Sequence, residues 1–109
     1  MNVVIYTCFH IKNKDSAQPS IMEQVTSCRE FAKRNNHTIV GEYYDETHLG
    51  SYHGRPVFYR MLGERIDTRF QGILTYSSDR INKNSFFFMF DEARLKEMDI
   101  ALFTTKSQD

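Results

Sequence analysis

The sequence predicts an α/β fold in which helices cover both faces of a mostly parallel sheet. Segments rich in β-branched and aromatic residues alternate with segments of helical periodicity along the whole chain. The first apolar segment, residues 3–9, is hydrophobic almost throughout, which is typical of a strand buried on both faces. The 109 residues are enough for one domain and too few for two. These observations favour the element order β-α-β-α-β-α-β.

The first half of the chain predicts two strands around one helix. After the strand at residues 3–9 and a polar loop, Pro19 precedes a helix for which Ser20 is a good N-cap and Glu23 completes a capping box. The second strand is expected at residues 37–44, after "RNNHT" ends the helix. The core side of the helix is predicted from apolar residues at helical spacing: Ile21, Val25, Cys28 and Ala32.

The second half repeats this alternation. The segment "RPVFYRMLGERI" predicts a helix with Pro56 in its first turn, where the missing N–H costs nothing. A strand is expected at residues 70–76, a polar loop at 77–84, a helix at 85–98 and a last strand at 99–104. In this last helix one stripe is expected to face the core: Phe86, Met89, Phe90 and Ala93.

The composition narrows the function classes. Hydrophobic residues make up 40% of the chain and charged residues 26%, which is ordinary for a globular protein. The net charge is zero, so the chain is not expected to grip DNA strongly by itself. Cys8 and Cys28 are too few for a disulfide framework and too far apart for a clustered metal site, which favours reduced thiols in a cytoplasmic protein. No apolar run approaches the ~18 residues of a membrane span, and no signal peptide is evident.

Polar side chains gather where the predicted strands end. Ligands of such sheets bind beyond the carboxyl ends of the strands. His10 ends the first strand, Arg55 ends the second loop, and the third loop carries Asp79, Arg80 and Lys83. Two guanidinium groups and an ammonium near one edge indicate a site for a phosphate or another anion, because the planar fork of arginine binds phosphate oxygens in pairs.

The order and spacing of several motifs resemble the catalytic domain of serine recombinases, the resolvase and invertase family. The segments "SIMEQ", "EYYDE", "LGSYHGRPVFYRML" and "ILTYSSDRINKN" carry this resemblance over nearly the whole chain. It implies a resolvase-like three-layer fold with strand order 2-1-3-4, and with the first helix on the face opposite the other two. It also implies that residues 1–109 form a single catalytic domain lacking the C-terminal strand, long dimer helix and DNA-binding region that follow in the family.

The resemblance also implies a chemistry. In the family a serine at the end of the first strand attacks a DNA phosphodiester, and arginines stabilise the charge that develops, with no metal or other cofactor. Here His10 stands at the nucleophile position, Cys8 replaces an arginine, Leu49 replaces a serine and Lys83 replaces the last arginine. The implied site residues are His10, Arg55, Asp79, Arg80, Lys83 and Gln24. The implied partners are DNA and, in a full-length parent, further copies of the chain, with no membrane.

Three interpretations stay open on the sequence. In the first, which we expect, the domain is a degenerate recombinase that no longer cuts DNA. In the second, His10 or Cys8 attacks a phosphate, with the pKa of the Cys8 thiol lowered near Arg55. In the third, the fold serves as a non-enzymatic protein-interaction or anion-binding domain. Under the third, Arg55 and Arg80 would form ion pairs inside the fold, with Asp45 and Asp79.

Overall fold

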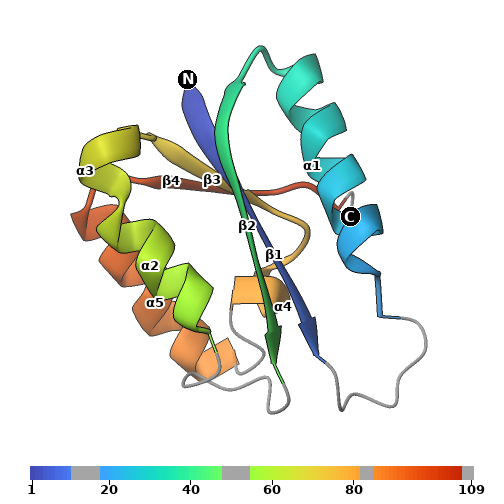
Figure 1. Cartoon of the computed structure of the whole chain (residues 1–109). Helices are drawn as coiled ribbons and strands as arrows, with labels where there is room; N and C mark the ends of the chain where they lie inside the picture. Colours follow the sequence, from blue (N-terminus) through green and yellow to red (C-terminus); the bar gives the residue numbers. More distant parts are fainter. Residues whose placement is uncertain (11–17, 48–54, 82–84, 107–109) are drawn as a thin grey trace.

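The computed structural model of the chain describes residues 1–10, 18–47, 55–81 and 85–106 (Figure 1). Its elements follow one another in this order: β1 (Asn2–His10), α1 (Ile21–Arg34), β2 (Thr38–Thr47), α2 (Pro56–Gly63), α3 (Arg65–Thr68), β3 (Gly72–Thr75), α4 (Ser78–Ile81), α5 (Ser85–Glu97) and β4 (Ala101–Thr104). The alternation of strands and helices therefore agrees with the sequence prediction.

The strands form one parallel sheet in the order β2-β1-β3-β4, which confirms the predicted α/β fold and its strand order. β1 lies inside the sheet and pairs with β2 along its full length, from Asn2 to His10. Its pairing with β3 covers only residues 3–5. The second half of β1 therefore needs other hydrogen-bond partners on its β3 side, because buried backbone groups are rarely left unpaired.

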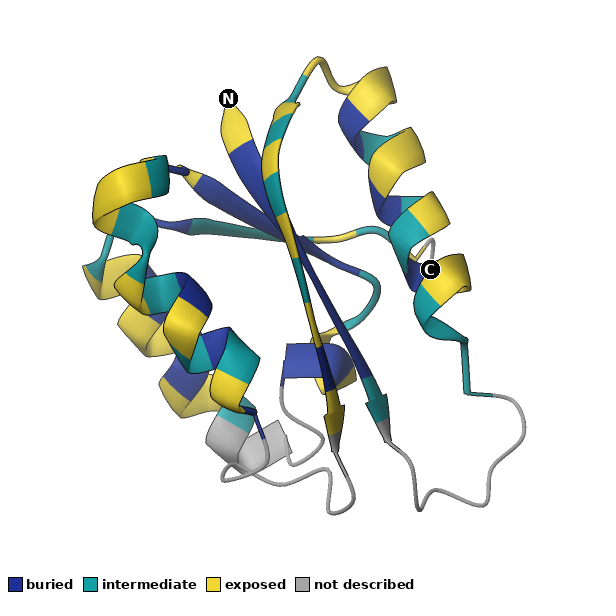
Figure 2. Cartoon of the chain, viewed as in Figure 1, coloured by how far each residue is buried: buried dark blue, intermediate teal, exposed yellow. Residues whose placement is uncertain are grey.

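Each face of the sheet carries its own hydrophobic cluster. On one face Cys28 and Ala32 of α1 pack on strand residues, namely Val3, Ile5 and Leu74. On the other face the cluster combines strand residues with residues of α2, α4 and α5, among them Val4, Tyr6, Cys8, Ile73, Phe58, Met61, Ile81 and Leu95. The first helix thus lies opposite the others, as predicted, and β1 between the two clusters is buried along most of its length (Figure 2).

The predicted N-terminus of α1 is confirmed in detail. Ser20 Oγ accepts from the Glu23 amide at 3.0 Å, and the Glu23 carboxylate accepts from the Ser20 amide at 3.1 Å. Two amides that the first turn cannot pair are thereby satisfied. The core side of α1 differs from the prediction in the first half of the helix, where Gln24 is fully buried while Ile21 and Val25 are only partly buried.

Two predictions in the second half are wrong. The predicted polar loop at residues 77–84 contains a helical turn, α4, with Ile81 fully buried beneath β1. Ile81 is the apolar residue of that polar run, and its burial draws the turn onto the sheet. The predicted helix through "GERI" also divides, since α2 ends at Gly63 and α3 starts at Arg65.

The predicted core stripe of α5 is also wrong. Met89 is 66% exposed and Phe90 60% exposed, whereas Asp91 and Leu95 are buried. Phe88 packs against the core, and Ala93 is exposed. The side chain of Phe86 lies outside the described residues. Aromatic residues surround the start of this helix, so periodicity does not select a face there. Asp91, whose ion pair is described below, lies on the buried side of the helix together with Phe88 and Leu95.

Candidate active site

The carboxyl end of β1 is the centre of the predicted site. Tyr6 and Cys8 lie on one face of β1 and are fully buried. His10 is the last residue of the strand, opposite Thr47 of β2, and its side chain lies outside the described residues. Lys83 also lies outside them. The structure therefore places His10 along the backbone only.

Gln24 takes the place of a strand partner beside β1. Its Oε1 accepts from the Cys8 amide at 3.1 Å, and its Nε2 donates to the Cys8 carbonyl at 2.9 Å and to the Pro19 carbonyl at 3.2 Å. One side-chain amide thus satisfies both backbone groups of Cys8, where β3 no longer pairs with β1. Through this contact, Gln24 fixes the backbone two residues before His10.

Arg80 approaches the same carbonyl from α4. Its Nη1 donates to the Cys8 carbonyl at 3.0 Å and to Gln18 Oε1 at 2.9 Å. Its Nη2 forms an ion pair with Asp79 Oδ2 at 2.9 Å, as expected under the third interpretation. The Arg80 side chain is only 4% exposed, while that of Asp79 is 51% exposed. The guanidinium therefore lies at the predicted edge but is occupied by contacts within the domain.

Arg55 lies just before α2 and is enclosed as well. Its Nη2 lies 3.2 Å from Asp91 Oδ2 of α5, and its Nη1 donates to the Ile81 carbonyl of α4. Its guanidinium carbon lies 4.7 Å from the centre of the Phe58 ring and 5.4 Å from that of Tyr59. Only 2% of its side chain is exposed. The prediction that Arg55 pairs with Asp45 is therefore wrong, since the carboxylate of its ion pair comes from Asp91.

Asp45 instead caps the N-terminus of α2, a role that the sequence analysis did not predict. Its Oδ2 accepts from the Tyr6 hydroxyl at 2.7 Å and from the Phe58 amide at 3.0 Å, and its Oδ1 accepts from the Val57 amide at 3.0 Å. The N-cap residue of α2, Arg55, makes no side-chain capping bond, so Asp45 near the end of β2 caps the helix from outside. The signal in the sequence is the absence of Ser, Thr, Asp or Asn before Pro56.

The structure thus brings Arg55, Arg80 and Gln24 together around the second half of β1. Arg80 and Ile81 are neighbours in α4, and Arg55 donates to the Ile81 carbonyl. Asp79 is part of the group through Arg80. The two cationic side chains are therefore close to one another, and both are neutralised by carboxylates of the same domain.

The surroundings of Cys8 do not activate its thiol. Burial raises the pKa of the Cys8 thiol to about 11, and the carboxylate of Asp45 acts in the same direction. The hydrogen bond to Tyr6 and the charges of Arg80 and Arg55 lower this pKa by less. The expectation of a lowered pKa near Arg55 is therefore wrong, because desolvation dominates over the attraction of the buried cations.

We expect both thiols to resist modification in the native protein. Burial also raises the pKa of Cys28 to about 11, so about one thiol in a thousand is ionised at pH 8. The raised pKa favours folding below pH 9, the usual thiol value, and this contribution is lost as the pH rises towards 11. A colorimetric disulfide reagent at pH 8 should therefore detect two thiols in denaturant and almost none without it. Rapid native labelling at pH 8 would contradict this prediction.

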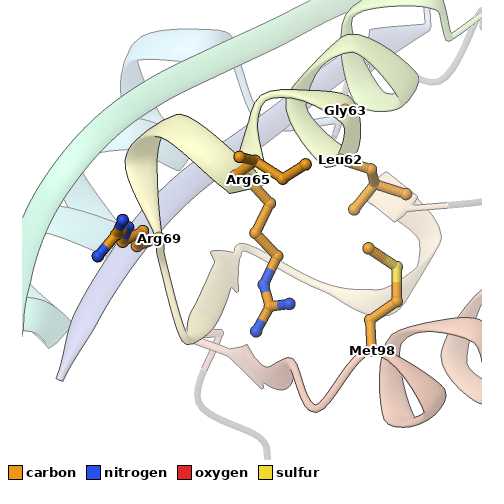
Figure 3. Close-up of a pocket in the computed structure, with 6 residues that line it drawn as sticks. Leu62, Gly63, Arg65, Arg69 and Met98 are labelled. Atoms are coloured by element: carbon orange, nitrogen blue, oxygen red, sulfur yellow. The ribbon is translucent and has the colours of Figure 1, made fainter.

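A surface cleft lies at the other end of the sheet. It has a volume of about 510 Å³ and is lined by Leu62, Gly63, Arg65, Ile66, Arg69 and Met98 (Figure 3). These residues come from the end of α2, from α3 and from the residues that directly follow α3 and α5, which lead into the amino ends of β3 and β4. None of them belongs to the predicted site, so this cleft and the carboxyl edge of β1 are separate features.

The described residues show neither a metal-ion cluster nor a membrane-spanning helix. Among them, no group of three or more His, Cys, Asp and Glu side chains is arranged to hold a metal ion. None of the helices described is long and apolar enough to cross a membrane.

The sequence matches one known protein family over most of its length. The sequence pattern of the family described as "Resolvase, N terminal domain" matches residues 12–109. A search of curated proteins gives no match.

Solved structures are similar over almost the whole chain. The N-terminal catalytic domain of TP901-1 integrase has a TM-score of 0.81 at 20% identity, covering 96% of this chain and 77% of that one. A resolvase family site-specific recombinase from Streptococcus pneumoniae has a TM-score of 0.76 at 24% identity, covering 96% and 72%. The C-terminal catalytic domain of ISC1926 TnpA, an IS607-like serine recombinase, has a TM-score of 0.78 at 14% identity, covering 100% and 70%. At these identities the similarity shows the fold.

Proposed function

The chain belongs to the resolvase N-terminal domain family, and from this premise we propose that it is a recombinase catalytic domain that no longer cleaves DNA. The observation that carries the proposal is the residue at the end of β1. His10 stands at the position of the attacking serine in the family pattern, as the last residue of that strand. The domain would keep the scaffold of a recombinase site without its nucleophile.

The chemistry of the family requires a hydroxyl at this position. The serine oxygen forms a bond to phosphorus, the bond from phosphorus to the 3′ oxygen breaks, and the 3′ oxygen leaves as a hydroxyl. His10 has no hydroxyl group to form that bond. The nearby thiol of Cys8 does not replace it, because that thiol is fully buried and its pKa is raised to about 11. We therefore propose that no phosphoserine-type intermediate forms.

The cationic side chains support the same proposal. Arginines of this family stabilise the negative charge that builds up on the phosphate, and removal of one positioned donor typically costs ~10²–10³ in rate. Here Cys8 stands at one arginine position. Arg55 and Arg80 are retained, and each is held in an ion pair within the domain, with Asp91 and Asp79. We propose that Arg55 and Arg80, together with Gln24 and Lys83, are what remains of a former phosphate-binding site.

A covalent adduct assay tests the proposal. The chain is fused to the long helix and DNA-binding region of an active relative and incubated with supercoiled DNA carrying that relative's crossover site. We expect no protein–DNA adduct on a denaturing gel from the unchanged fusion. The fusion carrying both His10→Ser and Cys8→Arg restores the nucleophile and the missing cation, so we expect it to form an adduct.

The single variants serve as controls for the assay. His10→Ser alone restores the hydroxyl without the cation, so its adduct should form ~10²–10³ times more slowly than that of the double variant. His10→Ala should be as inactive as the unchanged fusion. An adduct from the unchanged fusion that disappears in His10→Ala would overturn the proposal and make histidine the nucleophile.

We also propose DNA and a second copy of the chain as partners in a full-length protein. This rests on the family and on two structural neighbours, an integrase and a site-specific recombinase. The net charge of zero indicates that this domain contributes little DNA affinity by itself.

A protein-interaction domain is the second candidate, and exposed apolar residues on α5 favour it. Met89 is 66% exposed and Phe90 is 60% exposed. Under this alternative the partner is a second copy, and Met89→Glu lowers self-association measured by sedimentation velocity. Arg94→Glu is the matched control, since Arg94 is an exposed residue of the same helix. A chain that stays monomeric at every concentration would contradict this candidate.

A further inference from the structure

Arg55 is enclosed by groups from several elements of the fold. Asp91 of α5 holds its Nη2 at 3.2 Å, and the Ile81 carbonyl of α4 accepts from its Nη1. Two aromatic rings of α2, those of Phe58 and Tyr59, lie within 5.4 Å of its guanidinium carbon. The Arg55 and Asp91 side chains are 2% and 4% exposed, so water screens their attraction only weakly.

A carboxylate in this position competes with an external anion. Carboxylate and phosphate oxygens bind the guanidinium fork in the same way, through charge-assisted hydrogen bonds at similar distances. Asp91 is part of the chain and therefore always present beside Arg55, whereas a phosphate must first be taken from water. The internal carboxylate accordingly has the advantage over a weakly binding external anion.

We propose that Asp91 is a positioning residue that acts as the internal counterion of Arg55 and keeps external phosphate from binding at the carboxyl edge of β1. This inference rests on the proposed function, because it takes Arg55 to stand at a phosphate-binding position of the family. It goes beyond the proposed function because it explains the loss of phosphate binding by Asp91, a residue outside the family motif.

The proposal predicts what happens when the charge of Asp91 is removed. Asp91→Asn keeps the size of the side chain and one acceptor oxygen but leaves a buried guanidinium without its carboxylate. A buried charge that loses its counterion is costly, which favours binding of another anion by Arg55 or a turn of its guanidinium outwards to water. Either movement makes its guanidinium available to phosphate.

The experiment is a titration with inorganic phosphate at constant ionic strength, using the whole 109-residue chain. The readout is the Arg55 Nε–Hε signal in ¹H–¹⁵N spectra, which Arg55→Lys identifies by its disappearance. In the unchanged protein we expect this signal not to move up to 50 mM phosphate, a range typical for weak anion sites. In Asp91→Asn we expect a saturating shift with a half-saturation concentration below about 5 mM, 10-fold under the highest phosphate concentration at which the unchanged protein shows no shift.

Asp67→Asn is the matched control. Asp67 is an exposed residue of α3, and its replacement changes the net charge by the same amount without touching Arg55. The control should behave like the unchanged protein.

Three results would overturn the proposal. The first is a phosphate-dependent shift of the Arg55 signal in the unchanged protein. The second is a folded Asp91→Asn variant whose titration matches that of Asp67→Asn. The third is an Asp91→Asn variant that stays unfolded at every phosphate concentration, whereas folding induced by phosphate supports the proposal. None of these results involves DNA cleavage. The adduct assay can therefore contradict the proposed function while the titration supports this inference, and the titration can contradict the inference while the assay supports the proposed function.

Discussion

Replacing Asp45 with alanine is expected to lower the free energy of unfolding by about 2–4 kcal/mol. The change removes the acceptor of three hydrogen bonds, from the Tyr6 hydroxyl, the Val57 amide and the Phe58 amide. The loss of a helix cap costs about 1 kcal/mol, and a buried hydroxyl without an acceptor costs about 1–3 kcal/mol more. Tyr6 is fully buried, so water cannot replace the lost carboxylate. Urea unfolding followed by circular dichroism measures the difference.

Two companion variants separate these contributions. Asp45→Asn keeps one acceptor oxygen and should cost less than Asp45→Ala. Combining Tyr6→Phe with Asp45→Ala removes the orphaned hydroxyl, so the pair should be less destabilising than the sum of the single changes. Asp67→Ala, at an exposed position of α3, should change stability by less than about 0.5 kcal/mol. A cost of Asp45→Ala below about 1 kcal/mol would show that the carboxylate does not hold α2 in place.

The parts of the fold that could be predicted depend on local signals. The apolar run of β1 requires burial on both faces, and the capping box of Ser20 and Glu23 fixes the start of α1. The strand order 2-1-3-4 is expected from the family resemblance, but the alternation of strands and helices along the chain follows from these local signals. Such features are encoded within a few residues, so the sequence alone reveals them.

The features that could not be predicted depend on pairs of residues far apart in the chain. The sequence indicates that Arg55 needs an anion, but not that Asp91 supplies it from α5. Asp91 also lies on the buried face of α5, which the aromatic residues at the start of the helix do not reveal through their periodicity. The double role of Gln24 is similar, because it depends on β3 ending its pairing with β1 after residue 5.

The candidate site shows the same division. The motif order places Arg55, Arg80 and Gln24 around the end of β1, and the structure brings these three together. Whether their side chains are available to a ligand could not be derived from the motif. Availability depends on Asp91 and Asp79, and Asp91 lies outside the core stripe that periodicity predicted for α5.

Breaking the Arg55–Asp91 pair is expected to be as costly as any single change in the domain. Removal of one partner from a buried ion pair typically costs about 3–5 kcal/mol, because the other charge stays buried without compensation. Both side chains are at most 4% exposed, so this estimate applies to Arg55→Met and to Asp91→Leu. Native domains are stable by only about 5–15 kcal/mol, so either variant should show a large fall in its urea midpoint.

The double variant Arg55→Met with Asp91→Leu is expected to recover most of this loss. A buried pair replaced by apolar residues of similar volume is often neutral or stabilising, since both desolvation penalties disappear together. The surroundings suit the exchange, because Phe58 and Tyr59 already line the Arg55 side chain with aromatic rings. We therefore expect the double variant to lie within about 1.5 kcal/mol of the unchanged protein, a coupling of several kcal/mol in the double-mutant cycle. Additive losses would instead show that each side chain stabilises the fold through its other contacts, such as the bond from Arg55 to the Ile81 carbonyl.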